Sequence, residues 1–256
     1  MTVTDRKAYI GIHGWSGAGK SWLASSAPGP RLVLEAEMGV FDTVHHPDHT
    51  INIKLWNPLT EPVPEDLTPD DSVVVSIRDL SKIRPIMQLL ESGNHQFETV
   101  IVDSFTEIQA MLKTIVASPG EEYDPNATFD MQAWGRLKNH GGILLRDLRD
   151  LTWPDAVKPI NAVVVMFSDD ETIPSVPLLE GGIRKAMFGW FDIVGYLFTA
   201  AIPDTLPIQK IRVMQIERDA TAMAKCRPHL VKVKHGSHVE SPDLTEIINT
   251  LNGGNS

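Results

Sequence analysis

The sequence is poor in cysteine and has no long apolar run. A single cysteine, Cys226, occurs in 256 residues, which excludes an internal disulfide framework and a zinc site built on cysteines. No apolar stretch approaches the roughly 18 residues that are needed to span a bilayer. The first residues lack the apolar segment and the cleavage site of a secretory signal. We therefore expect the chain to stay in the cytoplasm.

Basic residues are scarce relative to acidic ones. The chain has 23 Lys and Arg against 33 Asp and Glu, a formal net charge of −10. This balance excludes indiscriminate coating of nucleic acid but permits a local basic surface. A hydrophobic content of 42% with 22% charged residues is typical of a globular protein. We expect one domain over residues 1–251 and a flexible tail at 252–256.

Short apolar runs rich in β-branched residues alternate with helix-like segments. This pattern predicts an α/β fold with a mostly parallel central sheet flanked by helices. The expected strands are Tyr9–His13, Arg31–Glu35, Val73–Ile77, Thr99–Asp103, Ala162–Phe167, Ile193–Thr199 and Ile211–Ile216. The expected helices are Asp79–Glu91, Ser104–Val116 and Phe129–Leu151. Loops are expected at Pro58–Asp71, Ser118–Thr128 and Asp169–Gly182.

A candidate phosphate-binding loop follows the first expected strand and opens a helix. The motif G-x-x-x-x-G-K-[ST] is matched by Gly14, Trp15, Ser16, Gly17, Ala18, Gly19, Lys20 and Ser21. In such a loop, backbone N–H groups surround the phosphates. Lys20 is then expected on the β- and γ-phosphates of ATP, and Ser21 on Mg²⁺. Trp15 either covers the site and stacks on a base, or packs on the domain surface.

Carboxylates follow two of the expected strands. Asp103 ends the apolar run from Val100, as the second metal-binding residue of a phosphate-loop protein does. The next residue is Ser104, so a carboxylate that activates water has to come from elsewhere in the chain. Glu35 and Glu37 end the strand that follows the phosphate-loop helix, at the edge where open α/β sheets bind ligands. We assign Glu37 as the base and leave Glu35 as a supporting or solvent-facing residue.

These motifs together resemble the RecA-like ATPase core. The similarity is greatest to phage-encoded RecA-like recombination proteins of the Sak-four single-strand annealing group, also described as phage AAA-type nucleotide-binding proteins. It extends over Trp134–Leu137, Val176–Arg184, Phe191–Val194 and Ala224–Arg227, nearly the whole chain. The resemblance implies a RecA-like fold, Mg²⁺-dependent ATP hydrolysis, and action on single-stranded DNA in recombination or annealing.

The pair Lys225 and Arg227 resembles the Lys-x-Arg element with which RecA-like ring proteins reach a neighbour's nucleotide site. The resemblance implies a homo-oligomer, a ring or a filament, in which these cations act in trans on the γ-phosphate. A solvated charge pair is the alternative. Cys226 between them is expected to point to the opposite face and to pack rather than react.

The resemblance also places single-stranded DNA near the segment Asp169–Phe188, the loop after a core strand. Arg184 and Lys185 are the expected phosphate contacts, and Phe188 the expected stacking residue. Residues 205–240 carry seven Lys or Arg and three Asp or Glu, a local net charge of +4. A single-strand binding protein is a further candidate partner. Where RecA has an amide that senses the γ-phosphate, this chain has Ser168 and Asp169, so the coupling of nucleotide to DNA is open.

Other interpretations remain at this stage. A DnaB-like helicase or packaging motor shares the motifs, although a motor normally needs an additional domain. A nucleotide-gated assembly module with slow hydrolysis fits them as well. The histidines of residues 45–49 are spaced like metal ligands, but Pro47 prevents the helix that would place His45 and His49 on one face, which favours a polar surface loop.

Overall fold

The structure, a computed structural model, describes residues 7–43, 51–117, 129–169, 171–180, 182–203, 205 and 207–253. The histidines of residues 45–49 and the expected loop at residues 118–128 lie outside these ranges. Within them, no helix is long and apolar enough to cross a bilayer.

The strands form a sheet with the order β11-β9-β8-β1-β6-β5-β2-β4-β3. From β8 to β3 all neighbours are parallel, whereas β9 and β11 are antiparallel additions at one side. The strands are β1 (Tyr9–Gly14), β2 (Arg31–Glu35), β3 (Asn52–Leu55), β4 (Asp71–Ser76), β5 (Thr99–Asp103), β6 (Asn161–Asp169), β7 (Val176–Pro177), β8 (Ile193–Ala201), β9 (Lys210–Gln215), β10 (Lys225–Cys226) and β11 (His238–Glu240).

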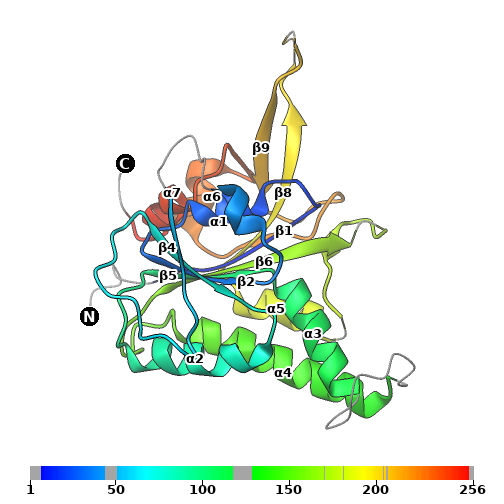
Figure 1. The fold of residues 1–256 in the computed structure, drawn as a ribbon. Helices are drawn as coiled ribbons and strands as arrows, with labels where there is room; N and C mark the ends of the chain where they lie inside the picture. The colour runs from blue at the N-terminus through cyan, green and yellow to red at the C-terminus, as the bar shows by residue number, and fades with distance from the viewer. Residues whose placement is uncertain are drawn as a thin grey trace.

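Helices cover both faces of the sheet (Figure 1). On one face lie α2 (Ile83–Ser92), α3 (Phe105–Ala117), α4 (Met131–Asp150) and α5 (Ile183–Trp190). On the other lie α1 (Lys20–Ser25), α6 (His229–His235) and α7 (Leu244–Leu251). Short 3-10 turns occur at Gly39–Thr43 and Leu80–Lys82. This is the three-layer α/β arrangement, with a mostly parallel sheet, that the sequence predicts for a RecA-like core.

Two apolar cores result from the alternation of side chains along the central strands. In β2, Leu32 and Leu34 pack under α2 and α4, whereas Val33 points into the layer of α1 and α7. Both faces of β2 are therefore buried, as is usual for parallel strands between helical layers.

The seven expected strands and three expected helices are all present, with ends that differ by at most four residues, the largest difference being at the start of α2. Asp79 explains one difference: its side chain accepts a hydrogen bond from Ser81 N–H, so the chain begins with a 3-10 turn before α2. The sequence did not predict β3, β10, β11, α5, α6 and α7. The expected loop from Asp169 contains the short strand β7.

β8 and β9 form a long antiparallel hairpin that projects from the body of the molecule (Figure 1). Its base lies beside β1, because β8 pairs with β1 in parallel up to Gly14 and Leu197. The hairpin therefore connects the neighbourhood of the phosphate loop with a surface well outside the central sheet.

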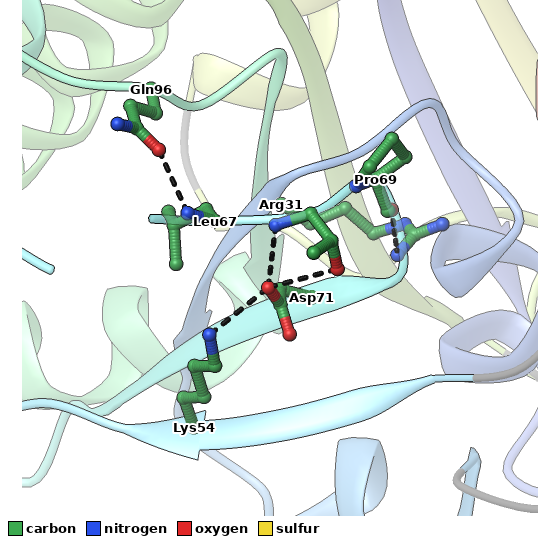
Figure 2. Close-up of polar contacts among 7 residues, drawn as sticks. Arg31, Lys54, Leu67, Pro69, Asp71 and Gln96 are labelled. Carbon is green, nitrogen blue, oxygen red and sulfur yellow. Dashed lines mark hydrogen bonds and ion pairs between the residues drawn. The ribbon is translucent and has the colours of Figure 1, made fainter. Parts of the chain in front are cut away.

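Asp71 at the start of β4 fixes the opposite side of the sheet (Figure 2). Its carboxylate accepts hydrogen bonds from Thr68 N–H at 2.6 Å and Thr68 Oγ1 at 3.0 Å, and from Lys54 Nζ of β3 at 3.0 Å. Burial alone would raise the pKa of Asp71, but these hydrogen bonds and the Lys54 charge hold it below its usual value. One carboxylate thus ties the edge strand β3 to β4 and closes the turn before β4.

We expect Asp71→Asn to lower the free energy of unfolding by about 1–3 kcal/mol, because it weakens several charge-assisted hydrogen bonds at a buried position. Chemical denaturation measures the change. Asp70→Asn is the matched control, since Asp70 is the exposed neighbour, and it should stay within about 0.5 kcal/mol of the parent protein. Equal effects of the two variants would contradict the role of Asp71.

Candidate nucleotide site

The loop after β1 has the backbone conformation that its glycines allow. Gly19 has φ of 93°, in the left-handed region, and immediately precedes α1. At Gly14, a Cβ atom would lie 2.4 Å from the carbonyl oxygen of Leu197 in β8. Any larger residue at position 14 would therefore separate the loop from the strand that supports it.

Lys20 lies across this loop. Its Nζ donates hydrogen bonds to the carbonyl oxygens of Gly14 at 3.0 Å and Trp15 at 2.9 Å, and it lies 4.5 Å from the centre of the Phe167 ring at the end of β6. The side chain is buried, with 7% of its surface exposed. The predicted phosphate-binding lysine is thus held inside the loop rather than on the protein surface.

Ser21 and Asp103 meet at the carboxyl edge of the sheet. The Ser21 hydroxyl forms a hydrogen bond with the Asp103 carboxyl group. Burial is the main cause that raises the pKa of Asp103 to about 7; the nearby charges of Glu35 and Glu37 act in the same direction, and the Ser21 hydrogen bond and the Lys20 charge oppose them. A divalent cation fits here, because hard oxygen donors are grouped together and their negative charges lack full compensation. Ser21 and Asp103 are the residues that would hold Mg²⁺.

Glu35 is a buried organiser of the chain that follows β2. Its Oε1 accepts a hydrogen bond from Glu37 N–H at 2.8 Å, and its Oε2 accepts one from Val40 N–H at 3.0 Å. Further hydrogen bonds come from Met38 and Gly39 N–H, although burial still leaves the pKa of Glu35 raised. Only 2% of this residue's surface is exposed. Of the two roles that the sequence leaves open, the structure shows a supporting residue and not a solvent-facing one.

Glu37 lies in the cleft beside the loop. The Ser104 hydroxyl donates a hydrogen bond to Glu37 Oε1, while Glu35 fixes its backbone. Burial raises the pKa of Glu37, and the hydrogen bond from Ser104 and the charge of Lys20 oppose that rise. Glu37 is therefore a half-buried residue whose carboxylate is oriented by Ser104 and whose backbone is fixed by Glu35.

Ser168 and Asp169, the residues in the place of a phosphate-sensing amide, are committed to other partners. The neutral ring of His13 lies between Met223 O, 2.8 Å from Nε2, and Ser168 Oγ, 2.9 Å from Nδ1. Burial lowers the pKa of His13 to about 4. We assign the proton to Nε2, since a carbonyl can only accept, so the Ser168 hydroxyl donates to Nδ1. Asp169 pairs with Arg184 at 3.7 Å.

A cleft of about 390 Å³ lies between the phosphate loop, Glu37 and β9. Its lining consists of Ser16, Gly17, Gly19, Lys20, Ser21, Trp22, Glu37, Gly39, Phe167 and Arg212. The sequence motifs predict the loop residues and Glu37 but give no signal for Arg212, which lies nearly 200 residues away on β9. Its guanidinium stacks on the Trp22 ring, 4.2 Å from the ring centre. Trp15 is 53% exposed and lines a neighbouring cavity of about 300 Å³ against β8.

Lys225 and Arg227 lie at the other edge of the sheet. β10 pairs with the start of β8, with Cys226 opposite Ile193, whereas the phosphate loop follows the far end of β1. The two edges are separated by the length of β1, five steps from Tyr9 to Gly14, or about 16 Å at the usual rise per residue. The two cations are therefore too distant to act on the nucleotide of their own chain. As expected, Cys226 between them points into a core, and burial raises the pKa of its thiol to about 11.

Both cations hold the end of α5. Lys225 Nζ donates to the carbonyl oxygens of Phe188 and, at 3.0 Å, of Phe191. Arg227 donates to the carbonyl oxygen of Gly189. Such bonds satisfy the last carbonyl groups of a helix and favour cations there. Arg227 is exposed, whereas Lys225 is half-buried and its pKa is lowered, first by burial and then by the Arg227 charge. Arg227 is thus the more accessible of the two.

The expected DNA loop requires a correction. Arg184, Lys185 and Phe188 do not lie on a loop but on helix α5. Phe188 is half-buried and packs against the core, so only part of its ring is available for stacking. Arg184 is paired with Asp169, and Lys185 alone is exposed. The signal for the helix was the spacing of Ile183 and Met187, four residues apart, which both enter the core.

Comparisons with known proteins identify the family of the chain. No curated protein matches the chain. A solved structure described as a prototypical ATPase from the type III secretion system of pathogenic bacteria matches 87% of this chain with 14% identity and a TM-score of 0.47. The chain covers 58% of the length of that ATPase. The family model described as AAA domain matches residues 6–228. The chain therefore belongs to the AAA domain family of ATPases.

Proposed function

We propose that the protein is a Mg²⁺-dependent ATPase of the RecA-like type that acts on single-stranded DNA in phage recombination or annealing. The observation that carries the hydrolysis is the fixed carboxylate of Glu37, bonded to Ser104 and lining the same cleft as Lys20. The DNA substrate and the phage context rest on the resemblance to the Sak-four group.

Each residue of the cleft has a separate role in this proposal. Lys20 binds the β- and γ-phosphates through its charge. Glu37 accepts a proton from the attacking water at the oxygen that Ser104 leaves open. When bound by Ser21 and Asp103, Mg²⁺ supplies positive charge to the phosphate oxygens. Glu35 positions Glu37 through the backbone and does not itself contact the substrate.

The proposed assembly is head to tail. The phosphate loop lies at the carboxyl edge of the sheet and Arg227 at the amino edge, so one contact between unlike edges brings Arg227 of one subunit to the cleft of the next. Repetition of such a contact gives a ring or a filament. Lys225 supports this interface from within its own chain, since its Nζ is bonded to Phe188 and Phe191.

One observation favours a second candidate, a nucleotide-gated assembly module with slow hydrolysis. The segment that the resemblance places near DNA is a packed helix with Phe188 half-buried against the core, which leaves Lys185 as its exposed cation. A module of this kind would hydrolyse ATP only to dismantle a ring or filament. DNA should then leave its turnover unchanged.

We expect single-stranded DNA to stimulate ATP turnover several-fold, and Lys185→Ala to lower the stimulation factor, because a phosphate contact is lost. A coupled assay of ADP release with and without an oligonucleotide measures this. Arg84→Ala, at an exposed arginine of α2, is the control and should keep the parent stimulation factor. Turnover that is indifferent to DNA would select the assembly module instead.

We expect Glu37→Gln to retain ATP binding but to lose hydrolysis by about 10²-fold or more, the size of a general-base contribution. Binding by calorimetry and turnover of the same sample separate the two effects. Glu35→Gln should instead lower the melting temperature, because it weakens the buried bonds to the backbone of residues 37–40. The base would be Glu35 if Glu35→Gln lost more turnover at unchanged stability.

We expect Arg227→Ala to bind ATP but to lose turnover by about 10³-fold or more, as other NTPases do without their arginine. Mixing this variant with Lys20→Ala protein should restore part of the turnover, because mixed interfaces join an intact loop to an intact Arg227. Turnover is measured at a concentration where the protein is oligomeric and exchanges subunits. Absence of recovery would contradict action in trans, and a single variant near parental activity would show a merely solvated arginine.

A further inference from the structure

Arg212 lies on the phosphate loop of its own chain. It is a residue of β9, opposite Thr199 of β8 in the hairpin. A Cβ atom built on Gly19 would lie 2.3 Å from Arg212 Nε and 3.2 Å from its Cζ. The guanidinium therefore fills the space over Gly19 that a side chain at that position would take. The absence of a side chain at Gly19 lets an arginine and the loop backbone come into contact.

The strand determines the direction in which Arg212 points. Met214, two residues along β9, is buried in the layer that contains α1. Residues two apart on a strand share a face, so Arg212 points into the same layer. β9 runs antiparallel to β8, which places Arg212 nearer the carboxyl edge than Met214. The guanidinium therefore lies at the start of α1, where the phosphate loop ends.

The surroundings of the guanidinium leave its charge uncompensated by carboxylates. Its Cζ lies 4.2 Å from the centre of the Trp22 ring. Stacking of this kind fixes the plane of the guanidinium without using its N–H donors. Within the described part of the chain, Arg212 forms no salt bridge with an acidic side chain. A half-buried arginine of this kind suits a bidentate contact with an anion in the cleft.

The sheet order indicates which end of the nucleotide lies near Arg212. The carboxylates of Glu37 and Asp103 follow β2 and β5, on one side of β1, whereas β9 lies on the other side beyond β8. The γ-phosphate has to face Glu37, because the attacking water is activated there. The phosphates nearer the ribose then lie toward Trp22 and Arg212.

We propose that Arg212 binds the α- and β-phosphates of the nucleotide from within its own subunit, as a binding residue rather than a catalytic one. The inference rests on the proposed function only for the presence of a nucleotide in the cleft, and not for hydrolysis or DNA. Because ATP and ADP share these phosphates, Arg212 stabilises both complexes. Its effect is uniform binding, which changes affinity and leaves the chemical step alone.

Calorimetric titration of the full chain with ATP and with ADP tests this directly. We expect Arg212→Ala to weaken both nucleotides by a similar factor, about 10-fold or more, as the loss of charge-assisted hydrogen bonds predicts. Arg212→Lys should recover only part of the affinity, because an ammonium lacks the planar fork.

Two control variants separate failure of this inference from failure of the site. Lys210→Ala removes an exposed cation of the same strand that does not line the cleft, and should bind ADP as the parent protein does. Lys20→Ala should lose binding. ADP affinity of Arg212→Ala within about 2-fold of the parent, with Lys20→Ala impaired, would overturn the role of Arg212 alone. A loss confined to ATP or to turnover would also overturn it, since the contact would then be to the γ-phosphate.

If the parent protein and Lys20→Ala bind nucleotide equally, both the inference and the proposed function fail together. Thermal unfolding of each variant without nucleotide removes the remaining ambiguity. A variant that unfolds at a lower temperature yet binds ADP normally would show that Arg212 only packs on Trp22, and this outcome overturns the proposal. The expected result is near-parental stability of Arg212→Lys together with weaker binding of both nucleotides.

Discussion

The parallel pairing of β2 with β5 is the constraint on which the site depends. It places Glu35 directly opposite Asp103 in the register, with both carboxyl groups buried. Two acids side by side in a core repel each other, and the pKa of Asp103 rises to about 7 as burial and its neighbours act together. The sheet thus holds a concentration of negative charge that Lys20 relieves in part. A cation between Ser21 and Asp103 would relieve the rest.

Glu35, the last residue of β2, and Glu37 are linked by a hydrogen bond from the backbone of Glu37 to the side chain of Glu35. Glu35 uses its oxygens on the N–H groups of the turn that follows, including that of Glu37. This arrangement fixes the direction of Glu37 without a side-chain contact between two acids. The Glu35 carboxylate accepts hydrogen bonds from backbone N–H groups that no longer have partners in the sheet. The position of the proposed base is therefore determined by a buried residue that has no contact with substrate.

The sequence predicts the parts of the site that are local in the chain. The phosphate loop and the acidic strand ends have fixed spacings, and parallel strands bring their carboxyl ends to one edge, so Lys20, Ser21, Glu37 and Asp103 could be predicted. Arg212 could not, because its place depends on hairpin pairing across the sheet. The helix at Ile183 was missed since the glycines before it favour a loop, whereas core packing of Met187 decides the structure.

In the proposed assembly, the two arginines divide the nucleotide between neighbouring subunits. Arg212 lies at the carboxyl edge, on the loop of its own chain, and Arg227 lies at the amino edge, on α5. An arginine in the same chain holds the phosphates that remain after hydrolysis, so it stabilises ATP and ADP states alike. An arginine from the next subunit has a new partner only while the γ-phosphate is present. An interface built this way is stable with ATP and weakened with ADP, and the binding step itself stays within one chain.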